Sequence, residues 1–421
     1  MRLLASVAVG LAFAVAAPAL APAASYRGTI SFRGAESSGI AVTLSRRSAT
    51  VALGPGHAAH AVVGVSRRSS RVRFAVPGRP SPLVFSLRVA GRRLVGTARQ
   101  ATARAAVSLR RGLPGADARL GFFTGVGGPF QVMRTVRDGF TRPVAIDLQS
   151  GAFGSSPSGA RVPVRQEEVR FRSGKVTIAG TLTLPTGPGP FPAAVYVSGS
   201  GRTLRDEAQF LGGALVTGGI AVLSYDKRGV GQSSGIFPGE LASPDAISTY
   251  AGDAVAGATF LSKQPEIDKR RIGFYGLSQG GWIIPLAAAR APAVVSWALI
   301  QGGPTVTQGE ADYYGSIARS WTGPLTEAEA QARRNGPSGF DPMPWIRRLS
   351  LPMLWLYGGD DRAEPPHTSI GLLHGLLTES PRDFTIRLYD GAPHPLFSSG
   401  GFAAGLFADV RAWLGAHSLA Q

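Results

Sequence analysis

Hydrophobic and polar positions follow two different patterns along this 421-residue chain, and the pattern changes near residue 166. Before that point, short runs rich in Val, Phe and Leu, such as Val72–Val76 and Leu83–Val89, are separated by turns of Arg, Ser and Gly. Short apolar runs at regular spacing are typical of an all-β sandwich or barrel. We therefore predict a β-rich module over residues 24–130, and we interpret the Gly-rich, irregular residues 131–165 as an extension and a linker.

From residue 166 to residue 421, continuous apolar stretches alternate with helical stretches, after a hairpin-like pair formed by EEVRFRSG and VTIAGTLTLP. The apolar strands that we predict are Ala193–Val197, Ala221–Tyr225, Arg271–Tyr275, Val295–Ile300, Met353–Tyr357 and Phe384–Leu388. Uninterrupted apolar strands between helices indicate a mostly parallel sheet that is covered on both faces, which is an α/β fold. Ligands of such sheets bind at the carboxyl ends of the strands, so candidate chemistry is sought there.

Residues 1–23 have the features of a signal peptide. Arg2 provides a short positive segment, residues 3–17 are apolar, and Ala21-Pro22-Ala23 offers a cleavage site between small residues. The uncharged run is also long enough to span a bilayer, so an uncleaved anchor is the alternative. Because Pro18 and Pro22 interrupt the end of the run, we favour cleavage. We expect the mature protein to be secreted or to lie in the cell envelope, outside the cytoplasmic membrane.

The composition of the chain excludes several kinds of site, and its positive charge is concentrated in one region. The chain has no Cys, which excludes disulfides, thiol catalysis and cysteine metal sites, and its six His show no HxH or HExxH spacing, so we expect neither a metal nor a cofactor. The formal net charge is +18, and residues 25–130 hold 17 Arg against only Glu36 and Asp117. Such a module attracts polyanions. We expect an anionic surface of the cell envelope as its partner, not nucleic acid, with a basic scaffold that binds nothing as the alternative.

A candidate nucleophile lies directly after one of the predicted strands. Gly276-x-Ser278-x-Gly280 follows the strand RIGFY and leads straight into the helical stretch Gly281–Arg290. Strand, sharp turn and helix are the context in which a nucleophilic serine is exposed at the edge of the sheet. The same pattern recurs around Ser233, but that match lies in the loop YDKRGVGQSSG, several residues past its strand. Context therefore favours Ser278.

A catalytic serine needs a base, and the base needs an acid that orients it. His394 lies in YDGAPHP, directly after the strand FTIRL, and is the candidate base. The candidate acid follows the strand MLWLY in GGDD, where spacing favours Asp361 over Asp360. Two backbone N–H groups would bind the oxyanion. We assign them to Gln279, next to the serine, and to Ser200 in the loop SGSG after AAVYV.

Several stretches of residues 166–421 together resemble the α/β-hydrolase superfamily. They are AGTLTLPTGPGPFPAAVYVSGSG, YDKRGVGQSSG, PEIDKRRIGFYGLSQGG, LPMLWLYGGDD and GAPHP. The resemblance is to the bacterial branch of serine aminopeptidase-like and dienelactone-hydrolase-like proteins, and residues 25–165 resemble, more loosely, the β-rich modules that precede such domains. It implies an α/β-hydrolase fold over residues 166–421. The chain departs from the branch at Arg202, where relatives often have a proline.

The resemblance also implies a short lid at about residues 302–350. Four aromatic residues of this segment either line a pocket or pack the lid onto the domain: Tyr313, Tyr314, Trp321 and Trp345.

These observations lead to a leading function and two alternatives. The leading one is a secreted serine hydrolase, carboxylesterase-like, in which Ser278, His394 and Asp361 cleave an ester through an acyl-enzyme. The first alternative is a serine peptidase of the aminopeptidase or oligopeptidase kind, for which Glu310 and Asp312 are the candidates to hold the amine of a short peptide substrate. The second is a non-catalytic protein that binds the cell envelope.

Overall fold

The structure is a computed structural model, and it describes the strands of the N-terminal part and most of the chain from residue 164 onward. The described ranges are 24–32, 38–44, 49–53, 60–61, 63–68, 70–76, 82–91, 93–111, 121–125, 128–137, 140–147, 153–154, 161–162, 164–205, 211–239, 243–398 and 401–419. The predicted signal peptide, residues 1–23, lies outside them. Within these ranges, no helix has the length and apolar character needed to cross a membrane.

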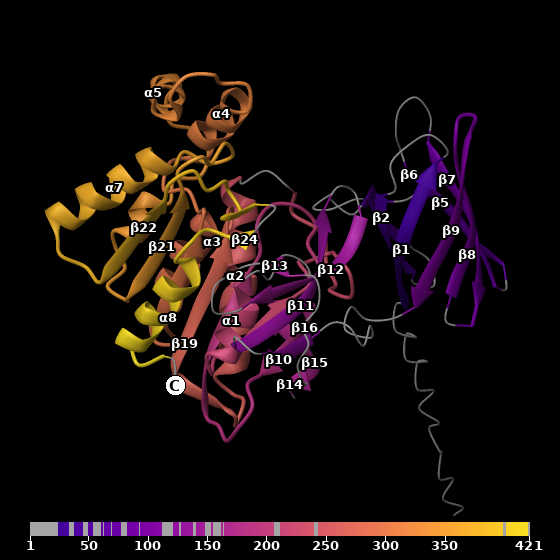
Figure 1. Ribbon diagram of the computed structural model, residues 1–421, viewed down its shortest axis with the longest axis horizontal. Coiled ribbons are helices and arrows are strands. Elements are labelled where there is room, and N and C mark those ends of the chain that lie inside the picture. The colour runs from indigo at the N-terminus through magenta and orange to yellow at the C-terminus, as the bar shows by residue number, and fades with distance from the viewer. Residues whose placement is uncertain are drawn as a thin grey trace, which may run out of the picture.

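The first nine strands form one antiparallel sheet (Figure 1). The strands are β1 (Ala24–Phe32), β2 (Ser38–Leu44), β3 (Ala49–Leu53), β4 (His60–Ala61), β5 (Val63–Arg68), β6 (Arg71–Val76), β7 (Leu83–Ala90), β8 (Arg93–Gln100) and β9 (Ala103–Arg111). Their order is β4-β3-β2-β1-β9-β8-β7-β6-β5. Alternate residues of β6 are buried, as expected for strands with one face on a core. Side chains from β1–β3 and from β6–β9 share a single apolar cluster.

A second antiparallel sheet follows, where the sequence indicated an irregular extension. It is ordered β13-β12-β11-β10-β14 and consists of β10 (Gly121–Gly125), β11 (Gly128–Arg137), β12 (Phe140–Asp147), β13 (Phe153–Gly154) and β14 (Arg161–Val162). The prediction of irregular structure here was wrong. Strands β11 and β12 pair with each other, and both contain Phe and Val residues. The sequence between them includes an Asp-Gly pair, which is typical of a hairpin turn. The many surrounding glycines hid this signal.

The C-terminal domain is built on an eight-stranded mixed sheet in the order β15-β16-β18-β17-β19-β20-β21-β22. Its strands are β15 (Arg165–Ser173), β16 (Val176–Leu184), β17 (Phe191–Val197), β18 (Ala221–Tyr225), β19 (Ile267–Leu277), β20 (Val295–Gln301), β21 (Met353–Gly358) and β22 (Phe384–Tyr389). The β15–β16 hairpin is antiparallel, and the strands from β18 to β22 run parallel. The predicted strands and the α/β fold are therefore confirmed.

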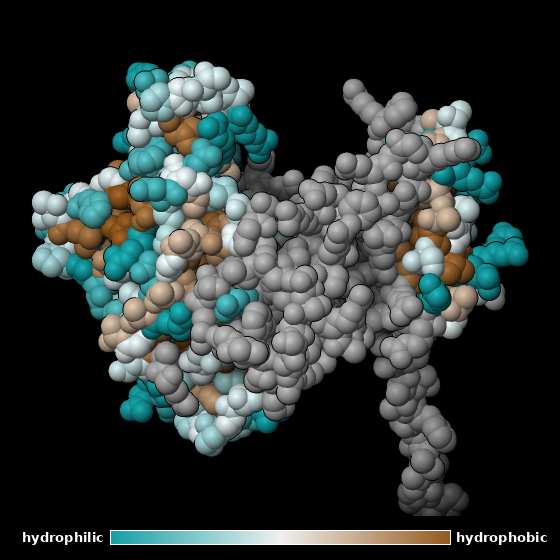
Figure 2. Space-filling view, viewed as in Figure 1, coloured by the Kyte–Doolittle hydropathy of each residue, from teal (hydrophilic) through white to brown (hydrophobic). Residues whose placement is uncertain are grey.

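Helices cover both faces of this sheet, because its central strands are apolar throughout. All seven residues of β17 are buried, and they alternate between two apolar clusters. The cluster on one face includes α2 (Pro244–Leu261), α3 (Gly280–Arg290) and α7 (Pro366–Glu379), and the other includes α1 (Gly212–Thr217) and α8 (Leu406–Ala416). Figure 1 shows these layers, and Figure 2 shows hydrophilic residues, in teal, over much of the described surface. A short two-stranded sheet, β23 (Phe397–Ser398) with β24 (Gly401–Phe402), precedes α8.

Three helices occupy the segment predicted to be a lid. They are α4 (Gln308–Ala318), α5 (Leu325–Asn335) and α6 (Met343–Ile346). The α4–α5 pair stands beyond the end of the sheet in Figure 1 and has its own small apolar cluster. Tyr314 is fully buried in that cluster, with Tyr313 and Trp321 packed against it. These three aromatic residues therefore pack α4 on α5, whereas Trp345, the fourth, packs against the main core of the domain.

Candidate active site

Ser278 lies in a strained turn between the end of β19 and the start of α3. Its φ is +55°, in the left-handed region that costs a non-glycine residue on the order of 1 kcal/mol or more. The Ser278 N–H donates a hydrogen bond of 2.9 Å to the carbonyl of Gln301 at the end of the neighbouring strand β20. The turn is therefore held by the sheet itself, and it leaves the Ser278 side chain half-buried at the carboxyl edge.

The glycines around Ser278 are required by close packing. A Cβ on Gly276 would lie 2.6 Å from Ile284 Cδ1 and 2.8 Å from the carbonyl oxygen of Val197. A Cβ on Gly281 would lie 2.6 Å from the backbone of Gly303. Any side chain at these positions would push the turn away from β17 and from the loop after β20. The motif therefore reflects both the turn and its packing.

Ser233, the other serine in a G-x-S-x-G pattern, is engaged in hydrogen bonds with the backbone of its own loop and of β16. It is buried, its hydroxyl donates to the carbonyl of Asp226 at 2.7 Å, and it accepts from the N–H of Ala179 at 2.9 Å. The Asp226 carboxylate accepts from the N–H groups of Arg205 and Gln232, which closes the loop after β18. Ser233 is thus part of the bonding that holds this loop to β16.

Asp361 and His394 come together from the loops after β21 and β22. His394 Nδ1 lies 2.7 Å from Asp361 Oδ2, and the other carboxylate oxygen of Asp361 accepts from the N–H groups of Ala363 and Glu364 at 2.8 and 2.9 Å. Asp361 is completely buried, whereas the His394 side chain is 22% exposed. The carboxylate is therefore fixed in position and in contact with an imidazole that remains accessible.

Asp360 and the other histidines after Ser278 have different partners. The Asp360 side chain is half-exposed and forms an ion pair with Arg362 at 3.2 Å. His367 Nδ1 lies 2.9 Å from Glu329 Oε1, and His417 Nδ1 lies 2.7 Å from the carbonyl of Trp413. His374 is exposed on α7. Of the two adjacent aspartates, Asp361 is the one that contacts His394.

The segment Gln301–Gly302 links the serine turn to the histidine loop. The Gln301 carbonyl accepts from Ser278, and its side-chain amide donates to the carbonyl of Pro395 at 2.6 Å. A Cβ on Gly302, whose φ is +54°, would lie 3.2 Å from the His394 ring. Ser278 and His394 are thus held against two consecutive residues. Sequence reasoning missed Gln301 because nothing in its local pattern differs from that of a buried strand end.

The loop after β17 lies against Ser278. A Cβ on Gly199 would be 3.3 Å from Ser278 Cβ. Ser200 follows it, and its N–H has no protein partner among the described residues. Gln279 is the N-cap of α3. The structure therefore places Ser200 and Gln279 in the two backbone segments that border Ser278.

Lys227 is a buried cation that contacts both of these segments, and the sequence did not single it out. Its Nζ donates to the carbonyl of Gly199 at 2.5 Å and to the side-chain oxygen of Gln279 at 3.0 Å, and it lies 4.7 Å from the centre of the Tyr250 ring. Because a trans peptide directs its C=O and N–H to opposite sides, the bond to Gly199 turns the N–H of Ser200 away from Lys227. The ammonium also polarises that peptide, which strengthens its N–H as a donor.

The predicted amine-binding carboxylates of the lid are not arranged for that role. Glu310 is buried, caps α4 through Thr307 and pairs with Arg333 at 2.6 Å, so this candidate is already engaged within the lid. Asp312 is exposed and accepts from the side chain of Gln308. Glu310 has the character of a capping residue because Thr307 precedes it by three positions, which is a capping-box spacing.

Glu364 places a second carboxyl group beside the Asp361–His394 pair. Burial raises the pKa of Glu364 well above its usual range, and the negative charge of Asp361 adds to this effect. Its Oε2 is buried and has no hydrogen-bond partner among the described residues. The same surroundings raise the pKa of the buried Tyr357 hydroxyl. The protonated form of Glu364 is therefore favoured at this position.

Among the described residues, no group of three or more His, Cys, Asp or Glu is placed to hold a metal ion. The chemistry that the arrangement offers is that of a hydroxyl, an imidazole and a buried carboxylate.

Arg202, where relatives often have a proline, donates to the carbonyl of Gly229 and lies 4.6 Å from the centre of the Phe237 ring. It therefore packs against the loop after β18.

Comparison with known proteins identifies similar chains for parts of this one. Residues 191–333 match the family model of serine aminopeptidase, S33. An uncharacterised protein of Mycobacterium tuberculosis is 29% identical over 216 residues, which are 50% of this chain and 68% of that protein. A polyketide transferase of Penicillium crustosum is 34% identical over 124 residues, which are 28% of this chain and 37% of that one. Two further mycobacterial relatives are matched over 32% of their own length.

A solved structure, the acylaminoacyl peptidase of Pyrococcus horikoshii, superposes on 92% of this chain and 70% of its own with a TM-score of 0.53. The sequence identity is 13%, so the likeness is one of fold.

The surroundings of Glu364 lead to a test based on pH. A carboxyl group whose pKa is raised on folding keeps a proton that the unfolded chain releases, so its contribution to stability falls as pH rises above the unfolded value of about 4.3. Glu364→Gln removes this ionisation. We expect the free energy of unfolding, measured with urea, to fall less between about pH 5 and about pH 8 in the variant than in the wild type. Glu327→Gln, at an exposed position of α5, is the control and should follow the wild type. An equally steep fall in Glu364→Gln would contradict the assignment.

Proposed function

We propose that this chain, whose C-terminal domain belongs to the α/β-hydrolase superfamily, is a serine hydrolase that cleaves carboxylic ester bonds. The observation that carries the proposal is the strained, half-buried Ser278 at the end of β19, whose N–H is bonded to Gln301. The next residue, Gly302, lies against the ring of His394, which is paired with the buried Asp361. A nucleophile, a base and a buried orienting acid from three different strand ends are the requirements of acyl transfer.

In the proposed mechanism, the Ser278 hydroxyl attacks the ester carbonyl and His394 accepts its proton. Asp361 holds the imidazole through Nδ1, so that Nε2 faces the reaction. The N–H groups of Ser200 and Gln279 stabilise the oxyanion, and Lys227 orients the first of them through the Gly199 carbonyl. His394 then returns the proton to the departing alcohol, and water, activated by His394, hydrolyses the acyl-enzyme.

An ester substrate is favoured over a peptide by the charges near the site. An aminopeptidase needs a carboxylate that binds the substrate's ammonium group, and Glu310 is engaged by Thr307 and Arg333. Glu364 lies close to Asp361, but burial favours its neutral form. The peptidase alternative is supported by the description of the matching family model and by the name of the structural neighbour. The substrate class is therefore the first thing to test.

The test compares p-nitrophenyl esters of short acids with aminoacyl p-nitroanilides. Each kcat/KM is divided by the rate of spontaneous hydrolysis of the same substrate, so that the greater reactivity of esters does not decide the outcome. We expect the larger acceleration with the esters, and we expect N-acetylation of the anilides not to slow them. A larger acceleration with the anilides, lost on N-acetylation, would assign the chain to the aminopeptidases instead.

The serine assignment predicts different effects for the two G-x-S-x-G serines. Ser278→Ala should reduce kcat for ester hydrolysis by roughly a millionfold and abolish labelling by a fluorophosphonate, because the nucleophile is gone. Ser233→Ala should keep its activity per folded molecule, although losing two buried hydrogen bonds lowers its stability. Activity and labelling that survive in Ser278→Ala would refute the proposal. A wild type that neither labels nor hydrolyses any ester or anilide would support the non-catalytic alternative.

The acid assignment predicts different effects for the two adjacent aspartates. Asp361→Asn leaves the size of the side chain unchanged but favours the wrong imidazole tautomer, and we expect it to cost on the order of ten-thousandfold in kcat. Asp360→Asn removes only the exposed contact with Arg362, so its kcat should stay near that of the wild type. Similar losses in both variants would contradict the geometry described for Asp361.

A further inference from the structure

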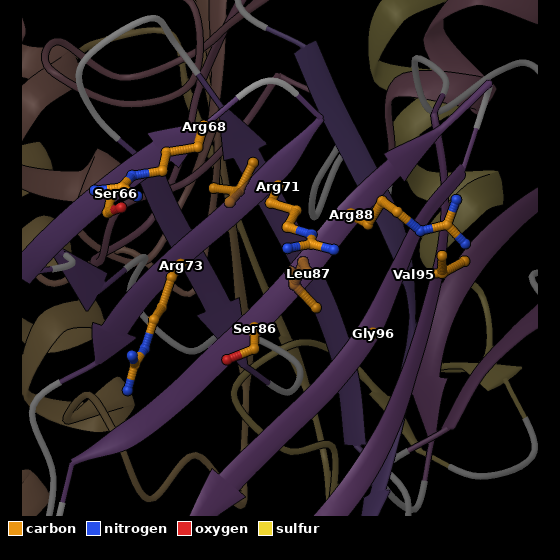
Figure 3. Close-up of a pocket in the computed structure, with 10 residues that line it drawn as sticks. Ser66, Arg68, Arg71, Arg73, Ser86, Leu87, Arg88, Val95 and Gly96 are labelled. Carbon is orange, nitrogen blue, oxygen red and sulfur yellow. The ribbon is translucent and has the colours of Figure 1, made fainter.

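The outer face of the N-terminal sheet carries a row of arginines that lie directly opposite one another. In the antiparallel register Arg68 of β5 pairs with Arg71 of β6, and Arg71 pairs with Arg88 of β7. Adjacent strands are about 4.8 Å apart, so the three side chains start within about 10 Å of one another. All three residues are exposed. Figure 3 shows Arg71 between Arg68 and Arg88.

These arginines line a hollow of about 530 Å³. Beside the row, Arg73 is flanked by the hydroxyls of Ser66 and Ser86, its direct partners on the two neighbouring strands. The hollow therefore presents four guanidinium groups and two hydroxyls on one face, while the opposite face of the same strands packs on the apolar cluster of the sheet.

No acidic side chain balances this charge within the described part of the sheet. The sequence from residue 63 to residue 111 contains neither Asp nor Glu, and Arg68, Arg71, Arg73 and Arg88 form no ion pair with any described residue. Like charges directly opposite each other destabilise a sheet. An anion that bridges the row relieves this repulsion. Binding therefore recovers the free energy that the repulsion costs the unbound protein.

We propose that this hollow binds a linear polyanion through its phosphate or carboxylate groups. The planar fork of each guanidinium suits bidentate contact with such groups, and a row of three favours a ligand that repeats its charges over one that carries a single charge. A chain lying across the strands would meet Arg68, Arg71 and Arg88 in succession and Arg73 from the side.

Two further observations favour such a polymer over a membrane or a nucleic acid. Membrane attachment usually adds apolar side chains to basic ones, but the large exposed apolar residues among those described, Ile236 and Leu388, belong to the C-terminal domain. Single-stranded nucleic acids are held by stacking on aromatic rings, whereas Phe74 and Phe85 of these strands are buried on the opposite face.

The test measures binding of the full-length protein to long-chain polyphosphate and to poly-L-glutamate over a range of salt concentrations. The variant is Arg68→Ser with Arg71→Ser and Arg88→Ser. The matched control is Arg270→Ser with Arg319→Ser and Arg334→Ser, which lowers the net charge equally at exposed positions of the C-terminal domain. We expect the first variant to lose on the order of tenfold or more in affinity at low salt, and its salt-dependence slope to fall by about two. The control should stay close to the wild type.

Stability measurements separate loss of the site from loss of the fold. Removing like charges that face each other should leave Tm unchanged or raise it. If the triple variant does not fold, Arg71→Ser alone tests the same row, because Arg71 is its centre. Equal loss of affinity in the variant and its control would overturn the proposal. So would binding to phosphatidylglycerol vesicles or single-stranded DNA that exceeds binding to both polymers.

Discussion

The left-handed backbone of Ser278 is the constraint on which the proposed site depends. A non-glycine residue keeps this conformation only where the surroundings determine it more strongly than the local preference opposes it. Here the sheet fixes this conformation. The Ser278 N–H is bonded to Gln301, and the flanking glycines pack directly on β17 and Gly303. A parallel arrangement of β17, β19 and β20 is needed for all of these contacts to meet at one edge.

The same edge brings together groups that are distant in the chain. Asp361 and His394 follow β21 and β22, and Lys227 follows β18, yet their contacts bring them to the segments that border the end of β19. Lys227 stands apart from the other groups because it contacts no reacting atom in the proposed mechanism. Its ammonium holds the Gly199 carbonyl and the Gln279 side chain, which lie on the two segments proposed to bind the oxyanion. Its burial beside Tyr250 keeps water from competing for these contacts.

Arginine has different surroundings in the two parts of the chain. In the C-terminal domain Arg205, Arg228 and Arg333 each meet a carboxylate, and the pair of Arg228 with the fully buried Asp253 joins the loop after β18 to α2. On the outer face of the N-terminal sheet, arginines meet one another. The N-terminal face therefore concentrates positive charge, whereas Arg205, Arg228 and Arg333 support the fold of the C-terminal domain.

Local sequence was sufficient for the strands of the C-terminal domain and for the turn at Ser278, because each depends on a strand and a helix that are adjacent in the chain. The distinction between Asp361 and Asp360 rested on one residue of spacing, and only the tertiary structure decides which carboxylate contacts His394, since the loop after β22 is 33 residues away. The sheet over residues 121–162 was missed because glycines hid its alternation. The contacts of Lys227 and Gln301 could not be predicted at all, because they join segments whose proximity exists only once the strands have taken their order in the sheet.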